Sequence, residues 1–190
     1  MLSSNLVCTN EMTYGHENEK HALEDYSANL ATVDASLHVE GSGLWDNPRF
    51  PELACSPDSV VIDRTGKVKG VVEVKCPFLL ADVRVEDFDT VLNKQQLSNF
   101  CLERTSDGSV RLKRHHMYYF QVQMQMGVLA VEWCDFMVWS KMSFVLERVK
   151  FDPVFWTALK RSLIDFHHQY LAPEYFEMRL PRALLPFCLD

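Results

Sequence analysis

The sequence lacks the features of a membrane or secreted protein. No apolar run approaches the roughly 18 residues that a membrane-spanning helix needs. The N-terminus has no basic start followed by a long apolar core, so it makes a poor signal peptide. The six cysteines are scattered and contain no C-x-x-C pair, which argues against zinc or iron–sulfur ligation and favours reduced thiols. We therefore expect an intracellular protein, cytoplasmic or nuclear, with no membrane partner.

The chain also has little positive charge. Its formal net charge of −7 does not by itself indicate a nucleic-acid binder. The charge is uneven, however, because acids crowd the first 25 residues while basic side chains gather between residues 104 and 116. No phosphate-binding glycine loop and no serine–histidine–carboxylate set is apparent. These absences exclude two common enzyme classes and leave a carboxylate-based site open.

What is present is an ordinary globular composition, with 47% apolar and 24% charged residues in a chain of 190. This length predicts a single domain over residues 1–190, with a core at about 14–150 and a C-terminal helix and tail at 152–190. Periodicity and turn residues predict helices at 14–30 (with Thr13 as N-cap), 81–92, 115–130 and 154–170 (with Asp152 as cap), strands at 34–40, 60–62, 68–74, 100–104, 110–113, 133–139 and 144–149, and a loop at 45–51. This order predicts an α/β fold, a central mixed β-sheet flanked by helices.

The most informative stretch is the predicted hairpin at residues 54–78. Asp58 opens its first strand, and Glu73 and Lys75 close its second. Residues two apart on a strand share a face, so Glu73 and Lys75 project together, near the end where Asp58 lies. Two carboxylates and a lysine at one sheet edge suit a hard divalent cation and an activated water. The alternative is an exposed hairpin with ordinary surface charges.

Three separated motifs decide between these interpretations. They are G-H-E-N-E at residues 15–19, S-P-D at 56–58 followed by E-V-K-C-P-F at 73–78, and Y-Y-F-Q-V-Q at 118–123. In this order and spacing, they resemble the YqaJ-type viral recombinases and phage lambda exonuclease, which belong to the PD-(D/E)xK nuclease superfamily. The resemblance covers about residues 14–149.

The resemblance implies a restriction-endonuclease-like α-β-β-β-α-β core and metal-dependent hydrolysis of DNA phosphodiester bonds. It further implies an exonuclease that acts on duplex ends in recombination or DNA processing, with Mg²⁺ as cofactor and Mn²⁺ as a substitute. The partners it implies are double-stranded DNA, further copies of the chain in a ring and a single-strand annealing protein.

Carried over by position, the resemblance makes Asp58 and Glu73 metal ligands, with the Val74 backbone carbonyl as a further ligand. It places Lys75 beside the attacking water. Glu19 would reach the site from the first helix and hold a metal-bound water or a second metal. Oxygen donors of this kind suit Mg²⁺ and Mn²⁺, which agrees with the assignment.

The later helix would complete the site. The resemblance makes Gln121 the residue that orients Lys75 or the water, and Tyr118, one turn earlier, would flank the site. Lys113 and Arg114 are the best basic candidates for contacts to the phosphate backbone, with a solvated hairpin arm as the alternative. The pair His115 and His116, at the start of this helix, could also contact phosphate, although a surface role is more common for such a pair.

Two departures from the family pattern keep other functions open. Ser59 stands where a glycine often follows the aspartate, and no basic residue precedes Lys20 to grip a 5′ phosphate. We therefore expect end recognition to differ or be lost, or the chain to be a fragment. The alternatives to an exonuclease are a catalytically silent DNA- or protein-binding module and an endonuclease or nickase.

Overall fold

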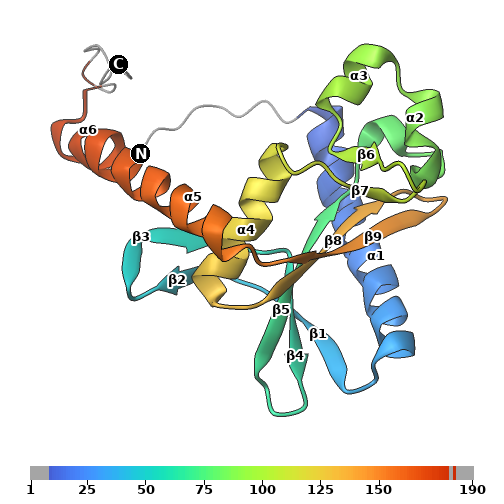
Figure 1. Ribbon diagram of the computed structural model, residues 1–190, viewed down its shortest axis with the longest axis horizontal. Coiled ribbons are helices and arrows are strands. Elements are labelled where there is room, and N and C mark those ends of the chain that lie inside the picture. Colours follow the sequence, from blue (N-terminus) through green and yellow to red (C-terminus); the bar gives the residue numbers. More distant parts are fainter. Residues whose placement is uncertain (1–8, 180–181, 183–190) are drawn as a thin grey trace.

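A five-stranded mixed sheet forms the centre of the computed structural model, which describes residues 9–179 and 182 (Figure 1). Its strands are β1 (Leu37–Gly41), β4 (Ser59–Asp63), β5 (Val68–Lys75), β8 (Trp133–Trp139) and β9 (Phe144–Lys150). They lie in the order β1-β4-β5-β8-β9, where only the central β5–β8 pair is parallel. The predicted mixed sheet is confirmed, and β5, which carries Glu73 and Lys75, lies in its middle.

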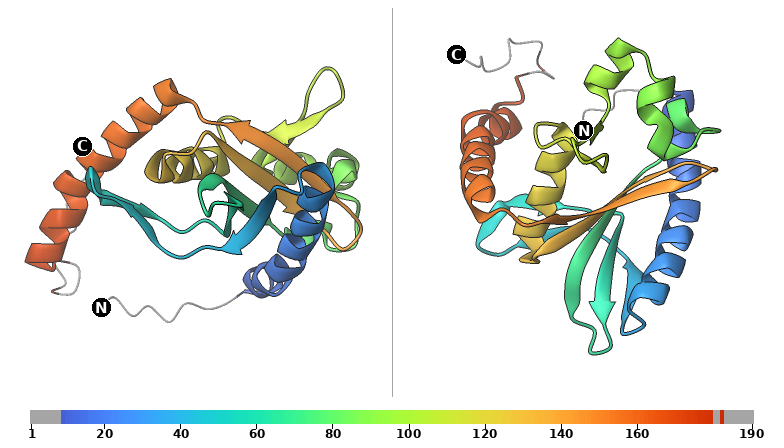
Figure 2. Two further views of the ribbon diagram at one scale, coloured as in Figure 1. Left: turned by 90° about the horizontal axis from the view of Figure 1, so that it is seen from below. Right: turned by 45° about the vertical axis from the view of Figure 1, so that its right-hand side comes forward.

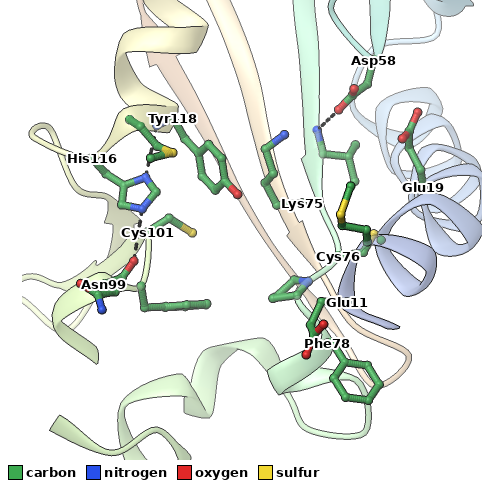
Figure 3. A pocket seen from close by; sticks show the side chains of 16 residues that line it. Glu11, Glu19, Asp58, Lys75, Cys76, Phe78, Asn99, Cys101, His116 and Tyr118 are labelled. Carbon is green, nitrogen blue, oxygen red and sulfur yellow. Dashed lines mark hydrogen bonds between the residues drawn. The ribbon is translucent and has the colours of Figure 1, made fainter. Parts of the chain in front are cut away.

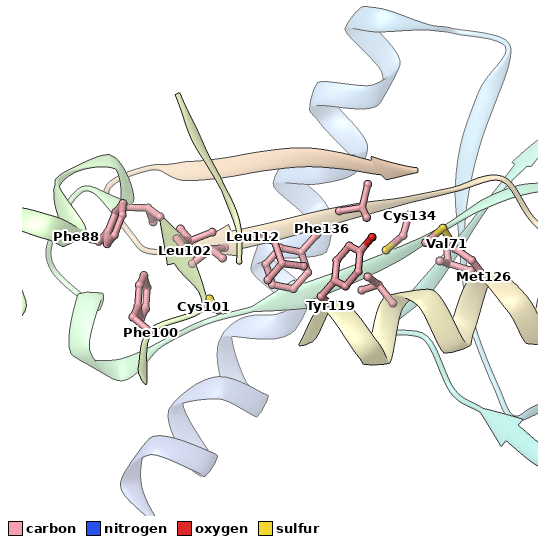
Figure 4. Packing of buried hydrophobic residues seen from close by; sticks show 14 of the residues in the cluster. Val71, Phe88, Phe100, Cys101, Leu102, Leu112, Tyr119, Met126, Cys134 and Phe136 are labelled. Carbon is pink, nitrogen blue, oxygen red and sulfur yellow. The ribbon is translucent and has the colours of Figure 1, made fainter. Parts of the chain in front are cut away.

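Helices α1 (Asn10–Val33) and α4 (Met117–Leu129) cover opposite faces of this sheet (Figure 2). The alternation of β5 explains how both faces are apolar, because successive side chains of a strand point to opposite sides. Val72 and Val74 pack with the α1 residues Ala22, Tyr26 and Leu30. On the other face, the core contains Val71, Leu112, Tyr119, Val122, Met126, Cys134 and Phe136 (Figure 4). Glu73 therefore points toward α4.

Helix α1 is longer than the sequence indicated. Thr9 is its N-cap and accepts a hydrogen bond from the backbone N–H of Met12 at 3.3 Å. Thr13, the cap expected from the sequence, lies inside the helix and donates its hydroxyl to the Thr9 carbonyl. The prediction of the starting point was wrong because both threonines precede acidic residues. The longer helix brings its first turns alongside the end of β5.

A second small sheet lies where a loop was predicted. Strands β2 (Trp45–Asn47) and β3 (Phe50–Cys55) pair antiparallel, with a register shift next to Asn47. They are covered by α4 and by α5 (Pro153–Phe166), whose Trp156 packs with Leu53. The asparagine and two prolines of residues 45–51 misled the prediction, because tertiary packing rather than propensity holds these strands.

The segment between β5 and α4 is built of short pieces: η1 (Phe78–Leu80), η2 (Val85–Asp87), α2 (Phe88–Val91), α3 (Lys94–Asn99), β6 (Leu102–Arg104) and β7 (Val110–Leu112). The single helix predicted at 81–92 was wrong, since a 3₁₀ turn (η2) and the four-residue helix α2 replace it. The β6–β7 hairpin was predicted correctly, and Gly108 in its turn has a φ of +84°.

Asp152 caps α5 as predicted, accepting from the N–H groups of Val154 and Phe155. The predicted helix at 154–170 is interrupted by a π-turn at His167–Leu171, followed by α6 (Ala172–Glu177). Four cysteines are free thiols (Cys55, Cys76, Cys101 and Cys134), while Cys8 and Cys188 lie outside the described residues. Within residues 9–179 and 182, no helix is both long enough and apolar enough to span a membrane.

Candidate active site

A cavity of about 570 Å³ opens at the end of β5, between α1 and the start of α4 (Figure 3). Side chains from segments far apart in the sequence border it. They include Glu19 of α1, Asp58 before β4, Lys75 at the end of β5 and Tyr118 of α4. In Figure 3, Tyr118 lies on one side of Lys75, while Asp58 and Glu19 lie on the other. The structure thus brings together four of the side chains that the sequence singled out.

Asp58 is held at the rim of the cavity by the neighbouring strand. Its Oδ2 accepts a hydrogen bond from the backbone N–H of Val74 at 2.6 Å. Burial, and after it the nearby Glu73 carboxylate, raise the pKa of Asp58 to about 7, although the Val74 hydrogen bond and Lys75 act in the opposite direction. Two carboxylates this close in a partly dry site repel each other, and a bound cation would relieve that repulsion.

Glu73 does not line the cavity and is 1% exposed, but it contacts Lys75, which does line it. Its Oε1 accepts hydrogen bonds from the Lys75 ammonium and from Gln121 Nε2, the latter at 2.6 Å. Its Oε2 accepts from Gln125 Nε2 at 2.7 Å. Gln121 therefore contacts Glu73 directly, whereas the sequence assigned it to Lys75 or the water.

Lys75 is the cationic group of the site. Burial lowers the pKa of Lys75, but attraction to the Glu73 carboxylate and the hydrogen bond to it outweigh this effect, and the net pKa is raised. Its Nζ also lies 4.8 Å from the centre of the Tyr118 ring, which favours a cation over the aromatic face. Lys75 is therefore an ammonium that spans Glu73 and Tyr118.

Glu19 borders the cavity because the first turns of α1 lie beside the end of β5. A Cβ on Gly15 would lie 3.9 Å from the Cys76 carbonyl oxygen, an ordinary contact distance. Glu19, one turn further along α1, borders the cavity on the same side as Asp58 (Figure 3). The Gly-x-x-x-Glu spacing therefore does place the third carboxylate at the site.

The two basic candidates for DNA contacts do not border this cavity. Lys113 donates from Nζ to the carbonyl oxygen of Leu97 at 2.7 Å, near the C-terminal end of α3. Arg114 forms an ion pair with Glu147 at 2.6 Å. Both side chains already have protein partners, so their predicted contacts with phosphate would require rearrangement and stay a prediction.

Gln125 was not assigned a role from the sequence, and His116 was named there only as a possible phosphate contact. Gln125 contacts Glu73, and the only available signal was its four-residue spacing from Gln121 on one helix. His116 borders the cavity and caps α4, where its Nδ1 accepts from the backbone N–H of Tyr118 at 3.2 Å. Burial lowers the pKa of His116, so the ring is a neutral cap rather than a phosphate-binding cation.

The donor chemistry fits a hard divalent cation. Asp58 and Glu19 offer carboxylate oxygens to one cavity, and Val74 borders it as well. A carboxylate has about four lone-pair positions, and Glu73 uses three of them. Over residues 9–179 and 182, no three His, Cys, Asp or Glu side chains already converge on one point. The fit therefore rests on the donor types and their common cavity.

The fold and these residues together define a class. A mixed sheet between two helices, with an aspartate before β4 and Glu-Val-Lys at the end of β5, has the architecture of the PD-(D/E)xK nucleases. The family model of the YqaJ-like viral recombinase domain matches residues 2–132, and the chain belongs to this family. The family resemblance predicted from the three motifs is confirmed.

Solved structures agree on the fold. The alkaline exonuclease LHK-Exo from Laribacter hongkongensis aligns with a TM-score of 0.61 and 22% identity, covering 92% of this chain and 76% of that chain. The structure of LHK-Exo in complex with dAMP aligns with a TM-score of 0.63 and 22% identity, covering 93% and 76%. No curated protein sequence gives a significant match.

Proposed function

We propose that this protein is a divalent-cation-dependent deoxyribonuclease that hydrolyses DNA phosphodiester bonds, acting as an exonuclease on duplex ends. The observation that carries the proposal is the convergence of Glu19, Asp58 and Lys75 on one cavity, with Lys75 bonded to the buried Glu73. Membership of the YqaJ-like viral recombinase family and the fold shared with an alkaline exonuclease support it.

In this proposal, Asp58, Glu73, Glu19 and the Val74 carbonyl would hold Mg²⁺, with Mn²⁺ as a chemical substitute. A bound cation would polarise the scissile phosphate and lower the pKa of the attacking water. The protein's own contribution is orientation and charge. Gln121 holds Glu73 in place through a 2.6 Å hydrogen bond, so that its remaining oxygen lone pair is available.

Lys75 has a separate role in this proposal. Its ammonium lies between the Glu73 carboxylate and the Tyr118 ring, at the border of the cavity. A phosphate that enters the cavity would meet this fixed positive charge, which stabilises negative charge as it develops on the phosphate oxygens. Tyr118 limits where the ammonium can lie and forms the opposite wall.

The wider setting follows from the family. We propose double-stranded DNA as the substrate, an intracellular location, a single catalytic domain, and assembly with further copies and with a single-strand annealing protein. LHK-Exo has been solved with dAMP, a nucleotide of the kind that DNA hydrolysis releases.

One observation favours the alternative, a catalytically silent binding module. The Glu73 carboxylate already accepts three hydrogen bonds from within the protein, and the Lys75 ammonium neutralises the charge of Glu73 without a metal ion. This arrangement would also stabilise a domain that no longer cleaves DNA. The two functions differ in whether a divalent cation enters the site.

The experiment is a cleavage assay on end-labelled linear duplex DNA with Mg²⁺, with EDTA, and on closed circular DNA of the same sequence. An end-dependent nuclease degrades only the linear DNA and only with Mg²⁺. Cleavage of the closed circle would instead indicate an endonuclease or nickase. Binding of DNA without cleavage under any of these conditions would establish the silent module.

A further inference from the structure

Helix α4 presents three glutamines at alternate positions, and they serve different partners. Gln121 and Gln125 lie one turn apart on the face toward β5, and both donate to Glu73. Gln123 faces elsewhere: its Nε2 donates to the Lys150 carbonyl at 2.9 Å, and its Oε1 accepts from the Asp152 N–H at 2.9 Å. Gln123 therefore joins α4 to the start of α5.

Gln125 is unusual among these three because its amide is only half satisfied. The residue is 2% exposed, and its Oε1 has no hydrogen-bond partner within the part of the chain that the structure describes. A buried polar atom without a partner destabilises a fold, and an apolar side chain of the same size would avoid that cost. The one polar contact that its side chain makes is the donation to Glu73 Oε2 at 2.7 Å.

The two amides act on different oxygens of one carboxylate. Gln121 donates to Oε1 and Gln125 donates to Oε2, so together they fix the plane of the carboxylate as well as its position. If only Lys75 and Gln121 held the carboxylate, both through Oε1, the group could rotate about that oxygen. Fixing both oxygens presets the direction in which Glu73 offers its free lone pair.

We infer that Gln125 is a positioning residue, which holds the Glu73 carboxylate in the orientation needed to bind a divalent cation. The inference rests on the proposed function, because it assigns Gln125 to the metal site of that same centre. Outer-sphere partners of metal ligands typically change metal affinity or activity about 10–100-fold when removed. Gln125 does not touch the DNA or the cation in this account.

The test measures Mn²⁺ binding to the DNA-free protein by calorimetry and by the loss of the free Mn²⁺ signal in electron paramagnetic resonance. Gln125→Met removes the donor and keeps the length of the side chain and its helix propensity. We expect the Kd for Mn²⁺ to rise about 10–100-fold. The melting temperature of the metal-free variant should change little, because the loss of the hydrogen bond to Glu73 Oε2 is offset by the removal of the unpaired Oε1.

Gln123→Met is the matched control, with the same substitution at a buried glutamine of the same helix. It should lower the metal-free melting temperature, because it leaves the Asp152 N–H and the Lys150 carbonyl without their partner, and it should leave the Kd for Mn²⁺ unchanged. Gln125→Leu is a second variant with the same expectation as Gln125→Met, should the latter fail to fold.

A wild-type Kd in either folded Gln125 variant overturns the inference. If the wild type binds Mn²⁺ and cleaves DNA while these variants bind equally well, only the role of Gln125 fails. If the wild-type protein binds no Mn²⁺ and cleaves no DNA, the proposed function fails as well. A rise in Kd of the same size in Gln123→Met would also overturn the inference, since a general loosening of α4 would then explain both results.

Discussion

Two helical glycines, Gly15 and Gly127, should respond to alanine with opposite signs. Alanine is about 0.8–1.0 kcal/mol better than glycine in a helix interior. At Gly15 of α1 the new Cβ would lie 3.9 Å from its nearest neighbour, so nothing opposes this gain. At Gly127 of α4 the Cβ would lie 2.4 Å from the indole ring of Trp156, where ordinary contacts are 3.4–4 Å.

The clash at Gly127 should outweigh the helical gain. Trp156 is 7% exposed and packs in a cluster with Leu53 and Val128, so the ring has little room to move. Overpacking of this kind costs about 1–3 kcal/mol. Subtracting the gain of about 0.8–1.0 kcal/mol leaves a net loss of up to about 2 kcal/mol for Gly127→Ala. For a chain of this size, a loss of about 2 kcal/mol lowers the melting temperature by about 4–8 °C.

Urea unfolding and thermal melting of Gly15→Ala, Gly127→Ala and the wild type measure this difference. We expect Gly15→Ala to gain up to about 1 kcal/mol. The reasoning is refuted if Gly127→Ala is as stable as the wild type, because Trp156 would then not be fixed against α4. Gly15 borders the active-site cavity, so this variant serves as a control for stability and not for activity.

Three further predictions concern the site and its support. Lys75→Met should cleave DNA about 10²–10³-fold more slowly in single-turnover assays of the folded fraction, and a near-normal rate would contradict the role of the ammonium. Tyr26→Phe should cost about 1.5–3 kcal/mol in urea unfolding, because the hydroxyl donates to the buried Asp135 carboxylate at 2.6 Å. Burial and Asp135 raise the pKa of Tyr26 above its usual value. The stabilisation that Tyr26 gives the fold is therefore complete below about pH 10 and is lost as the pH rises through the folded-state pKa. The stability of Tyr26→Phe should lack this alkaline decline. Mg²⁺ at about 100 times its Kd should stabilise the wild type by about 2.7 kcal/mol, seen as a higher melting temperature that EDTA reverses and that Asp58→Ala abolishes.

The central hairpin and the later helix were predictable because local and tertiary preferences agree there. The β-branched runs of β4 and β5 are buried on both faces of the sheet, and Gly66 adopts a φ of +80° in the turn between them. The same agreement holds in β8 and β9, which pair along their whole length as predicted. Such segments need no information from the rest of the chain.

The small β2–β3 sheet could not be predicted from its own residues. Its prolines and asparagine favour a loop, yet Leu53 is 4% exposed because α4 and α5 pack over these strands. That packing depends on Gly127, which admits the Trp156 ring. The helix predicted at 154–170 is present, but its π-turn was not predicted, since no proline or glycine stands at residues 167–171.

The candidate site was predictable in its acids and only partly in its supporting residues. Glu19, Asp58 and Lys75 were found from motif spacing, and the structure places all three at one cavity. Gln125 was missed because a glutamine on a helix looks like a solvated residue until the register between α4 and β5 is known. Only the fold shows that its amide meets Glu73 at 2.7 Å.

The most direct test of the central claim is single-turnover cleavage of end-labelled linear duplex DNA by the wild-type protein and by Asp58→Ala. Mg²⁺-dependent release of nucleotides by the wild type, and its loss in a variant with an unchanged circular dichroism spectrum, is the result we predict. Mg²⁺-dependent cleavage by Asp58→Ala at the wild-type rate would contradict the assignment of this site, because Asp58 would then not hold the cation.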